Sequence, residues 1–203
     1  MPKTTFHHLP KLKRQKITEA IQTVFIEKPM SKISVTDIVT EANIPRGSFY
    51  QYFDDLDDVF SYLFDTALSA FETDVHARLK EKQYPFFVYL KLSFERDYHF
   101  FTHTSYHKIL VKFFQHNPIY TIDFDAYRKR RRAFYEKVIG LLDITALKSL
   151  SHERITHLYH YLQQMKMQLI QKSFKHRLDY EEAKTEFHWF IDVIASGIKE
   201  NAS

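Results

Sequence analysis

The alternation of apolar and polar residues predicts helices along nearly the whole chain of 203 residues. A first helix is expected from about residue 10 to residue 27, with one apolar stripe formed by Ile17, Ala20, Ile21, Val24 and Phe25. Two short helices joined by a tight turn follow between residues 33 and 53. The stripe of the first helix would cover this pair, so the three helices can share one small core.

The segment ISVTDIVTEANIPRGSFYQYF, residues 33–53, contains the signals that begin and end this pair of helices. Ser34 precedes the first apolar run and Asp37 follows three residues later, which is the spacing of a capping box. Asn43 tolerates the left-handed conformation that ends a helix, and Pro45 can begin the next helix. We therefore predict a helix, a turn at residues 43–45, and a second helix of about two turns.

The side chains of that second helix divide by chemical type. Phe49 and Phe53 are apolar and fall on one side. The other positions supply guanidinium, hydroxyl and amide groups, from Arg46, Ser48, Tyr50, Gln51 and Tyr52. Such groups can hold phosphates and read base edges in a major groove, so the pattern indicates DNA binding.

Beyond residue 53 the pattern predicts longer helices. A helix that starts near Asp55, where four aspartates cap its first turn, carries an apolar stripe that could reach Leu79. Residues 84–135 hold 16 Phe and Tyr residues, which favours buried helices. Two further helices, from about residue 151 and from residue 180 to 199, have strong apolar stripes; they fit either a monomer core or a two-fold four-helix bundle with a second chain.

Composition supports an all-α protein and excludes several classes. Only three glycines and six prolines leave little material for β-turns, and no cysteine is present for disulfides or thiolate chemistry. We find no transmembrane run and no signal peptide, so a cytoplasmic location without membrane contact is expected. The net charge of +4 arises in residues 1–53, where eight Lys or Arg face four Asp or Glu, while the rest is neutral. A basic head on a neutral body suits a DNA-binding domain joined to a body with another task.

The stretch IPRGSFYQYF resembles the helix-turn-helix of the TetR family of bacterial transcription regulators. In that family a small residue, Ser or Thr, an apolar residue, Tyr, a variable residue, an aromatic or His, and Phe follow one another. Those positions are filled here by Gly47, Ser48, Phe49, Tyr50, Tyr52 and Phe53. The family usually has a lysine where this chain has Leu56. The absence of that lysine removes one expected contact with the DNA backbone.

The resemblance implies an all-α fold, with a three-helix helix-turn-helix DNA-binding domain at residues 1–54 and a larger helical effector-binding and dimerisation domain at 55–203. Within the head we expect Gly47 to allow close approach to DNA, Ser48, Tyr50 and Tyr52 to hold phosphates, and Arg46, Gln51 and Thr36 to reach base edges; Ser34 completes the predicted interface. It further implies a homodimer through the two C-terminal helices that binds a palindromic double-stranded DNA operator.

A small-molecule effector of unknown identity is expected in the aromatic body. The candidate ligand-binding residues are Phe64, Phe101, Tyr106, Phe113, Tyr127 and Phe134, although aromatic side chains can equally form plain core. His99, His103 and His107 share the spacing of one helical face, but no acid or cysteine completes a site, so no metal and no cofactor are predicted.

We therefore predict a DNA-binding transcriptional regulator, most simply a repressor that its effector releases from the operator. The alternative from another class is a helical small-molecule-binding protein or enzyme with a vestigial DNA-binding head. No nucleophile motif or glycine-rich phosphate loop supports an enzyme. An activator, or a nucleoid-type binder without an effector, is a second alternative.

Overall fold

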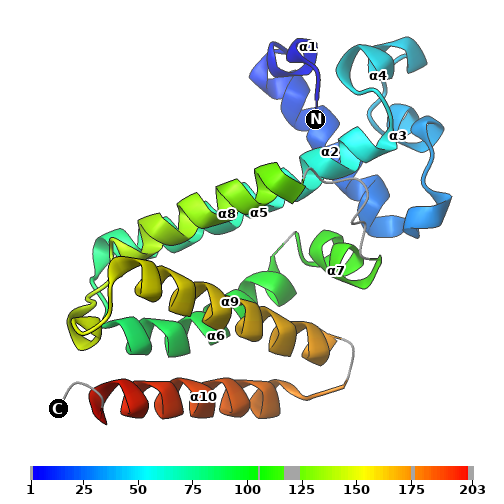
Figure 1. The fold of residues 1–203 in the computed structure, drawn as a ribbon. Coiled ribbons are helices and arrows are strands. Elements are labelled where there is room, and N and C mark those ends of the chain that lie inside the picture. Colours follow the sequence, from blue (N-terminus) through cyan, green and yellow to red (C-terminus); the bar gives the residue numbers. More distant parts are fainter. Residues whose placement is uncertain (1, 105, 117–123, 175–176, 201–203) are drawn as a thin grey trace. The chain divides into compact units, whose positions relative to one another are not determined.

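The computed structural model describes residues 2–104, 106–116, 124–174 and 177–200. Within these ranges the regular structure is helical and contains no β-strand, which confirms the all-α prediction. The elements in chain order are α1 (Thr4–His7), α2 (Lys11–Glu27), η1 (Met30–Lys32), α3 (Val35–Glu41), α4 (Arg46–Tyr52), α5 (Leu56–Glu81), α6 (Phe86–His103), α7 (His107–His116), α8 (Phe124–Ile139), η2 (Thr145–Leu147), α9 (His152–Phe174) and α10 (Tyr180–Glu200) (Figure 1).

The chain forms two compact units. Unit 1 comprises Met1–Ala70 and Ser105–Phe124, and unit 2 comprises Phe71–Thr104 and Asp125–Ser203. Helix α5 contributes its first part to unit 1 and its last part to unit 2. Unit 1 therefore contains the whole segment 1–54 that was expected to bind DNA, together with the start of α5 and all of α7.

The core of unit 1 joins the three predicted helices to elements that lie beyond them. Ile21 of α2, Ile38 of α3 and Phe49 of α4 are completely buried, as is Leu63 of α5. Ile109 of α7 completes this cluster and is 2% exposed. A segment far along the sequence thus closes the core of the N-terminal unit.

A lysine of helix α7 bonds to the end of α2. The Nζ atom of Lys112 donates hydrogen bonds to the backbone carbonyl oxygens of Phe25, Ile26 and Lys28, at 2.5, 3.1 and 2.7 Å. These are carbonyls at the end of α2, where a helix leaves its last C=O groups without internal partners. Lys112 therefore satisfies the C-terminus of α2 from another element.

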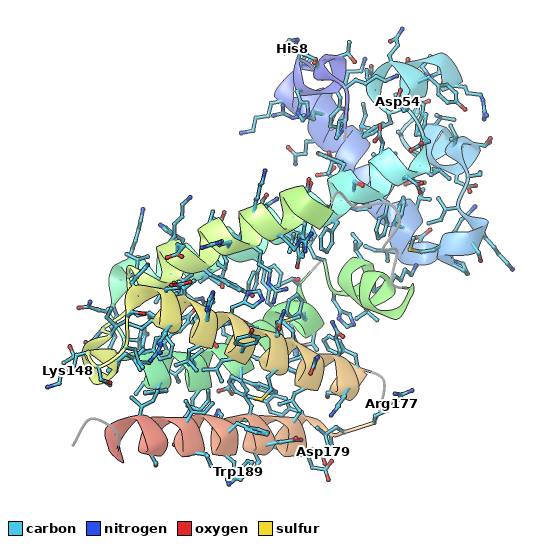
Figure 2. The ribbon with its side chains drawn as sticks, in the orientation of Figure 1. His8, Asp54, Lys148, Arg177, Asp179 and Trp189 are labelled. Carbon is cyan, nitrogen blue, oxygen red and sulfur yellow. The ribbon has the colours of Figure 1, made fainter. Side chains whose placement is uncertain are left out.

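Unit 2 is a group of long helices in which α10 packs against α6 and α9 (Figure 1). Phe187 of α10 is fully buried and stacks on Phe94 of α6, with ring centroids 5.4 Å apart. The opposite side of α10 carries Trp189, 59% exposed, whose side chain points away from α6 and α9 (Figure 2). None of the described helices is long and apolar enough to cross a membrane.

Candidate nucleic-acid interface

Helix α3 is fixed at its N-terminus by the capping box that the sequence predicts. The Ser34 hydroxyl accepts a hydrogen bond from the Asp37 backbone N–H at 3.3 Å, and the Asp37 carboxylate accepts one from the Ser34 backbone N–H at 2.9 Å. Lys28 lies 2.6 Å from the same carboxylate. The hydrogen bond from Lys28, followed by those from Ser34, lowers the pKa of Asp37, so this carboxylate stays ionised at neutral pH.

The turn between α3 and α4 has the geometry that its residues favour. Asn43 has a φ of 49°, in the left-handed region, and the Ile44 backbone N–H donates to the Val39 carbonyl at 3.0 Å. Pro45 then precedes the first residue of α4. These three features set the direction in which α4 leaves α3.

The two sides of α4 differ as the sequence predicts. Phe49 is completely buried, whereas Arg46, Gly47, Tyr50 and Gln51 are exposed and Ser48 is half-buried. A Cβ atom placed on Gly47 would meet nothing within 4 Å, so the backbone of α4 is open to the solvent there. This side of α4 offers a guanidinium, hydroxyls, an amide and an accessible backbone.

Arg46 links the exposed residues of both helices. Its Nη1 donates to the Thr36 hydroxyl of α3 at 3.1 Å, and its Nη2 donates to the Tyr50 hydroxyl at 3.3 Å. Among the described residues no carboxylate pairs with Arg46. The guanidinium therefore keeps its charge available for a phosphate or a guanine edge.

Tyr52 occupies a different place from the one that the sequence suggested. It was predicted to hold a phosphate, but its side chain is only 5% exposed and its ring lies 5.9 Å from that of Phe6 in the core of unit 1. The structure therefore places Tyr52 inside the unit, whereas Tyr50, 44% exposed, remains on the surface.

The N-terminal segment completes the end of α4, an arrangement that the pattern of the sequence does not predict. The backbone N–H of Lys3 donates to the Tyr52 carbonyl at 2.8 Å, its ammonium donates to the Tyr50 carbonyl at 2.9 Å, and the Thr5 hydroxyl donates to the Gln51 carbonyl. Three carbonyls in the last turn of α4 thus find donors in residues 3–5. The available signal was Phe6, an apolar residue in a polar segment, which is fully buried.

The aspartates after α4 act as a cap for α5. The Asp55 carboxylate accepts from the Asp58 backbone N–H at 2.9 Å, and the Asp58 carboxylate accepts from the Asp54 backbone N–H at 3.0 Å. Leu56 packs against the core of unit 1. Lys3 lies 2.6 Å from Asp54, so the N-terminal segment brings an ammonium group close to the start of α5.

The candidate ligand-binding residues divide between the two units. Phe64 is buried in unit 1, and Tyr106 packs against the core of that unit. Phe101, Tyr127 and Phe134 belong to unit 2, and the Phe113 side chain lies outside the described residues. The described candidates therefore belong to both units, with three of them in unit 2.

Two of the three histidines considered for a metal lie side by side. The rings of His99 and His103 stack with centroids 4.3 Å apart. In the described part of the chain, no three His, Asp or Glu side chains gather as metal ligands would.

Comparisons with known proteins find a match for the N-terminal helices and a similar fold for the chain. Residues 17–63 match the family model described as bacterial regulatory proteins, tetR family. The fold is similar to that of a TetR-like transcriptional regulator from Rhodococcus sp. RHA1, with 14% identity and a TM-score of 0.63 over 94% of this chain and 100% of the other. A second TetR transcriptional regulator from Rhodococcus sp. RHA1 has 14% identity and a TM-score of 0.62, covering 89% of this chain and 94% of the other. No curated protein is similar enough in sequence to count as a relative.

Proposed function

Since residues 17–63 form the DNA-binding domain of the TetR family of bacterial transcriptional regulators, we propose that this protein is a repressor that a small molecule releases from a palindromic operator. The chain is a DNA-binding transcriptional regulator, and regulators of this family are not enzymes. The role as a repressor and the release by an effector are the parts that we propose.

One observation carries the DNA-binding mode. Arg46, without a carboxylate partner among the described residues, joins Thr36 and Tyr50 in one exposed polar row across α3 and α4. We assign Arg46, Gln51 and Thr36 to base edges, and Ser48, Tyr50 and the backbone at Gly47 to phosphates. Ser34 contributes by fixing the start of α3.

A helix of seven residues makes too few contacts for tight specific binding by itself. We propose that two chains pair through α9 and α10, so that two α4 helices read two half-sites about one DNA turn apart. Support comes from the exposed side of α10, where Trp189 is 59% and Val193 is 50% exposed at i and i+4. Large exposed apolar side chains in a row are typical of a covered surface.

The course of helix α5 through both units suggests how an effector acts. Helix α5 contributes to both units, and α7 is tied to α2 through Lys112. An effector that binds better to the form of the dimer that does not fit DNA shifts the population toward that form and lowers operator occupancy.

The test is a DNA-binding titration with the operator selected from random duplexes. Tyr50→Ala should weaken binding to all sequences by about 1–3 kcal/mol, while Gln51→Ala should relax the preference at one base position. Arg132→Gln, an exposed change on α8, is the control and should leave the affinity unchanged. Unchanged binding by both α4 variants would contradict the assignment.

A separate experiment tests the alternative of a vestigial head. Affinity for random double-stranded DNA should fall steeply with salt, because phosphate contacts release counterions. No detectable binding at low salt would favour a helical small-molecule-binding protein instead.

A further inference from the structure

The interior of unit 2 contains charged side chains, which is unusual for a helical core. Lys166 of α9 is completely buried and Asp97 of α6 is 1% exposed. The Lys166 ammonium lies 2.5 Å from the Asp97 carboxylate and donates to the Ser93 hydroxyl at 2.8 Å. Arg96 reaches the other oxygen of Asp97 through its Nε at 2.8 Å.

Tyrosines extend this cluster from α6 and α9 to α8. Arg96 donates to the Tyr89 hydroxyl at 3.3 Å, and Tyr89 shares a hydrogen bond with Tyr159 of α9. The ring of Tyr159 meets that of Tyr135 of α8 edge-on, with centroids 5.1 Å apart. Arg131 of α8 then donates to the Tyr135 hydroxyl at 2.6 Å.

The charges of this cluster do not balance. Arg96, Arg131 and Lys166 are three cations, and Asp97 is the one carboxylate that pairs with any of them in the described part of the chain. Burial lowers the pKa of Lys166 to about 8; Asp97 opposes this effect, and the charges of Arg96 and Arg131 add to it. Lys166 and Asp97 compensate each other in the interior, and the partly exposed Arg96 and Arg131 add an excess of positive charge beside this pair. Such an excess favours a bound anion.

A hydrogen-bond donor without a partner lies on the same helix face. Gln163 is 6% exposed, and its Nε2 has no hydrogen-bond partner among the described residues. It stands four residues after Tyr159 and three before Lys166, so all three side chains share one face of α9. Buried amide groups are normally paired, so this N–H donor remains available to an oxygen atom of a ligand.

An aromatic wall adjoins the cations. Phe101 lies one helical turn beyond Asp97 on α6, and Phe134 lies one turn beyond Arg131 on α8. Phe71 of α5 stacks on Phe101 with ring centroids 5.6 Å apart and contacts Phe134 at 6.3 Å. On both α6 and α8, a phenyl ring of this aromatic group thus lies one helical turn from a charged residue of the cluster.

We propose that Arg131, Lys166 and Gln163 form the binding site for an organic carboxylate, whose apolar body packs on Phe101 and Phe134. The inference rests on the proposed function, because it names the chemical class of the effector. A carboxylate can accept two hydrogen bonds from a guanidinium and leaves oxygen lone pairs for the ammonium and the amide. Asp97 and Arg96 hold Lys166 in position.

The test uses pairs of ligands with the same skeleton and different charge. The full-length protein is titrated by calorimetry with benzoate, 4-phenylbutyrate and decanoate, each against its neutral alcohol, and with inorganic phosphate. We expect saturable binding of at least one carboxylate, with its alcohol and phosphate weaker by at least about tenfold. Equal binding of acid and alcohol, or no saturable carboxylate up to about 10 mM, would overturn the proposal.

Variants locate the site. Arg131→Gln and Gln163→Leu should each weaken the carboxylate by about tenfold or more, whereas Arg132→Gln, an exposed neighbour on α8, should not. Circular dichroism melting checks that each variant is folded, and Gln163→Leu serves if Arg131→Gln is not. Affinities of both site variants equal to that of Arg132→Gln would refute the location.

Operator binding in the same samples separates this proposal from the repressor role. A carboxylate that binds through Arg131 without changing operator affinity would leave the site standing and contradict effector release. If a neutral alcohol releases the operator as strongly as its acid does, effector release is supported and the carboxylate site is contradicted.

Discussion

Single side chains decide where the exposed polar surface of α4 ends. Tyr50 and Tyr52 look alike in the sequence, yet Tyr50 is 44% exposed and Tyr52 is 5% exposed. The difference is Phe6, which brings the N-terminal segment over the end of α4 and closes it around Tyr52. Phe6, 46 positions before Tyr52 in the sequence, thus accounts for the burial of Tyr52 while Tyr50 stays on the surface.

Phe6→Ala should destabilise unit 1 by about 3–5 kcal/mol, because a fully buried phenyl ring leaves a cavity when it is removed. Urea unfolding followed by circular dichroism measures the loss. His8→Ala, at an exposed position of the same segment, should cost little. Equal stability of the two variants would show that residues 3–7 do not pack as described.

Lys166 gives stability a recognisable dependence on pH. Its pKa is about 8 in the folded protein and 10.5 in an exposed lysine, so between these values the unfolded chain binds more protons. Stability gains from this residue as pH rises through that range, whereas the protonated, buried form is destabilising below it. The charges of Asp97, Arg96 and Arg131 all act on the ammonium.

We therefore expect wild-type protein to gain stability relative to Lys166→Met between pH 7 and pH 10. The free energy of unfolding of each protein is measured at several pH values, and the value for Lys166→Met is subtracted from that for wild type. Because both proteins contain the same neighbouring tyrosines, the contributions of those tyrosines to the pH dependence cancel in this difference. A difference that stays constant with pH would contradict a lowered pKa of Lys166.

At the scale of elements, the helices and their order were predictable, and the partners of their polar groups were not. Ser34, Asn43 and Pro45 act locally, so the boundaries of α3 and α4 follow from the sequence. Lys166 lies three residues after Gln163 and four after Leu162, on the buried side of α9. Periodicity alone would place a lysine on the solvent side of the helix. Its partner Asp97 is distant in sequence, and such pairing cannot be read from spacing.

Lys112 is the clearest case of an element held by a distant partner. Lys112→Met keeps the apolar stem and removes three hydrogen bonds to the end of α2, so unit 1 should lose about 1–3 kcal/mol. Hydrogen exchange of α2 and α7 amides should become faster. Lys108→Met, at an exposed position of the same helix, is the matched control. Equal stability and equal exchange rates of the two variants would contradict a stabilising role of the Lys112 hydrogen bonds.

For the whole molecule, the proposed DNA binding and the proposed pairing of chains depend on different units. The exposed polar row lies on α3 and α4 of unit 1, whereas Trp189 and Val193 lie on α10 of unit 2. If pairing occurs through α9 and α10, its loss should leave each unit folded and still weaken operator binding, because two half-sites must be read together.

Trp189→Glu should shift the protein from dimer to monomer in sedimentation velocity, since it places a charge at the centre of the apolar side of α10. Leu12→Glu, at another large exposed apolar position, should not change the sedimentation coefficient. A Trp189→Glu variant that sediments as wild type would contradict pairing through this surface.

The membership of α7 in unit 1 has a consequence for protein synthesis. The N-terminal helices leave the ribosome before α7 exists, because residues 71–104 of the other unit lie between them in the chain. At 5–20 residues per second, roughly 3–12 s separate the completion of residue 54 from that of Lys112. During this interval the end of α2 has no Lys112 and the core no Ile109. The N-terminal unit is therefore begun first and closed only after part of the second unit has been made.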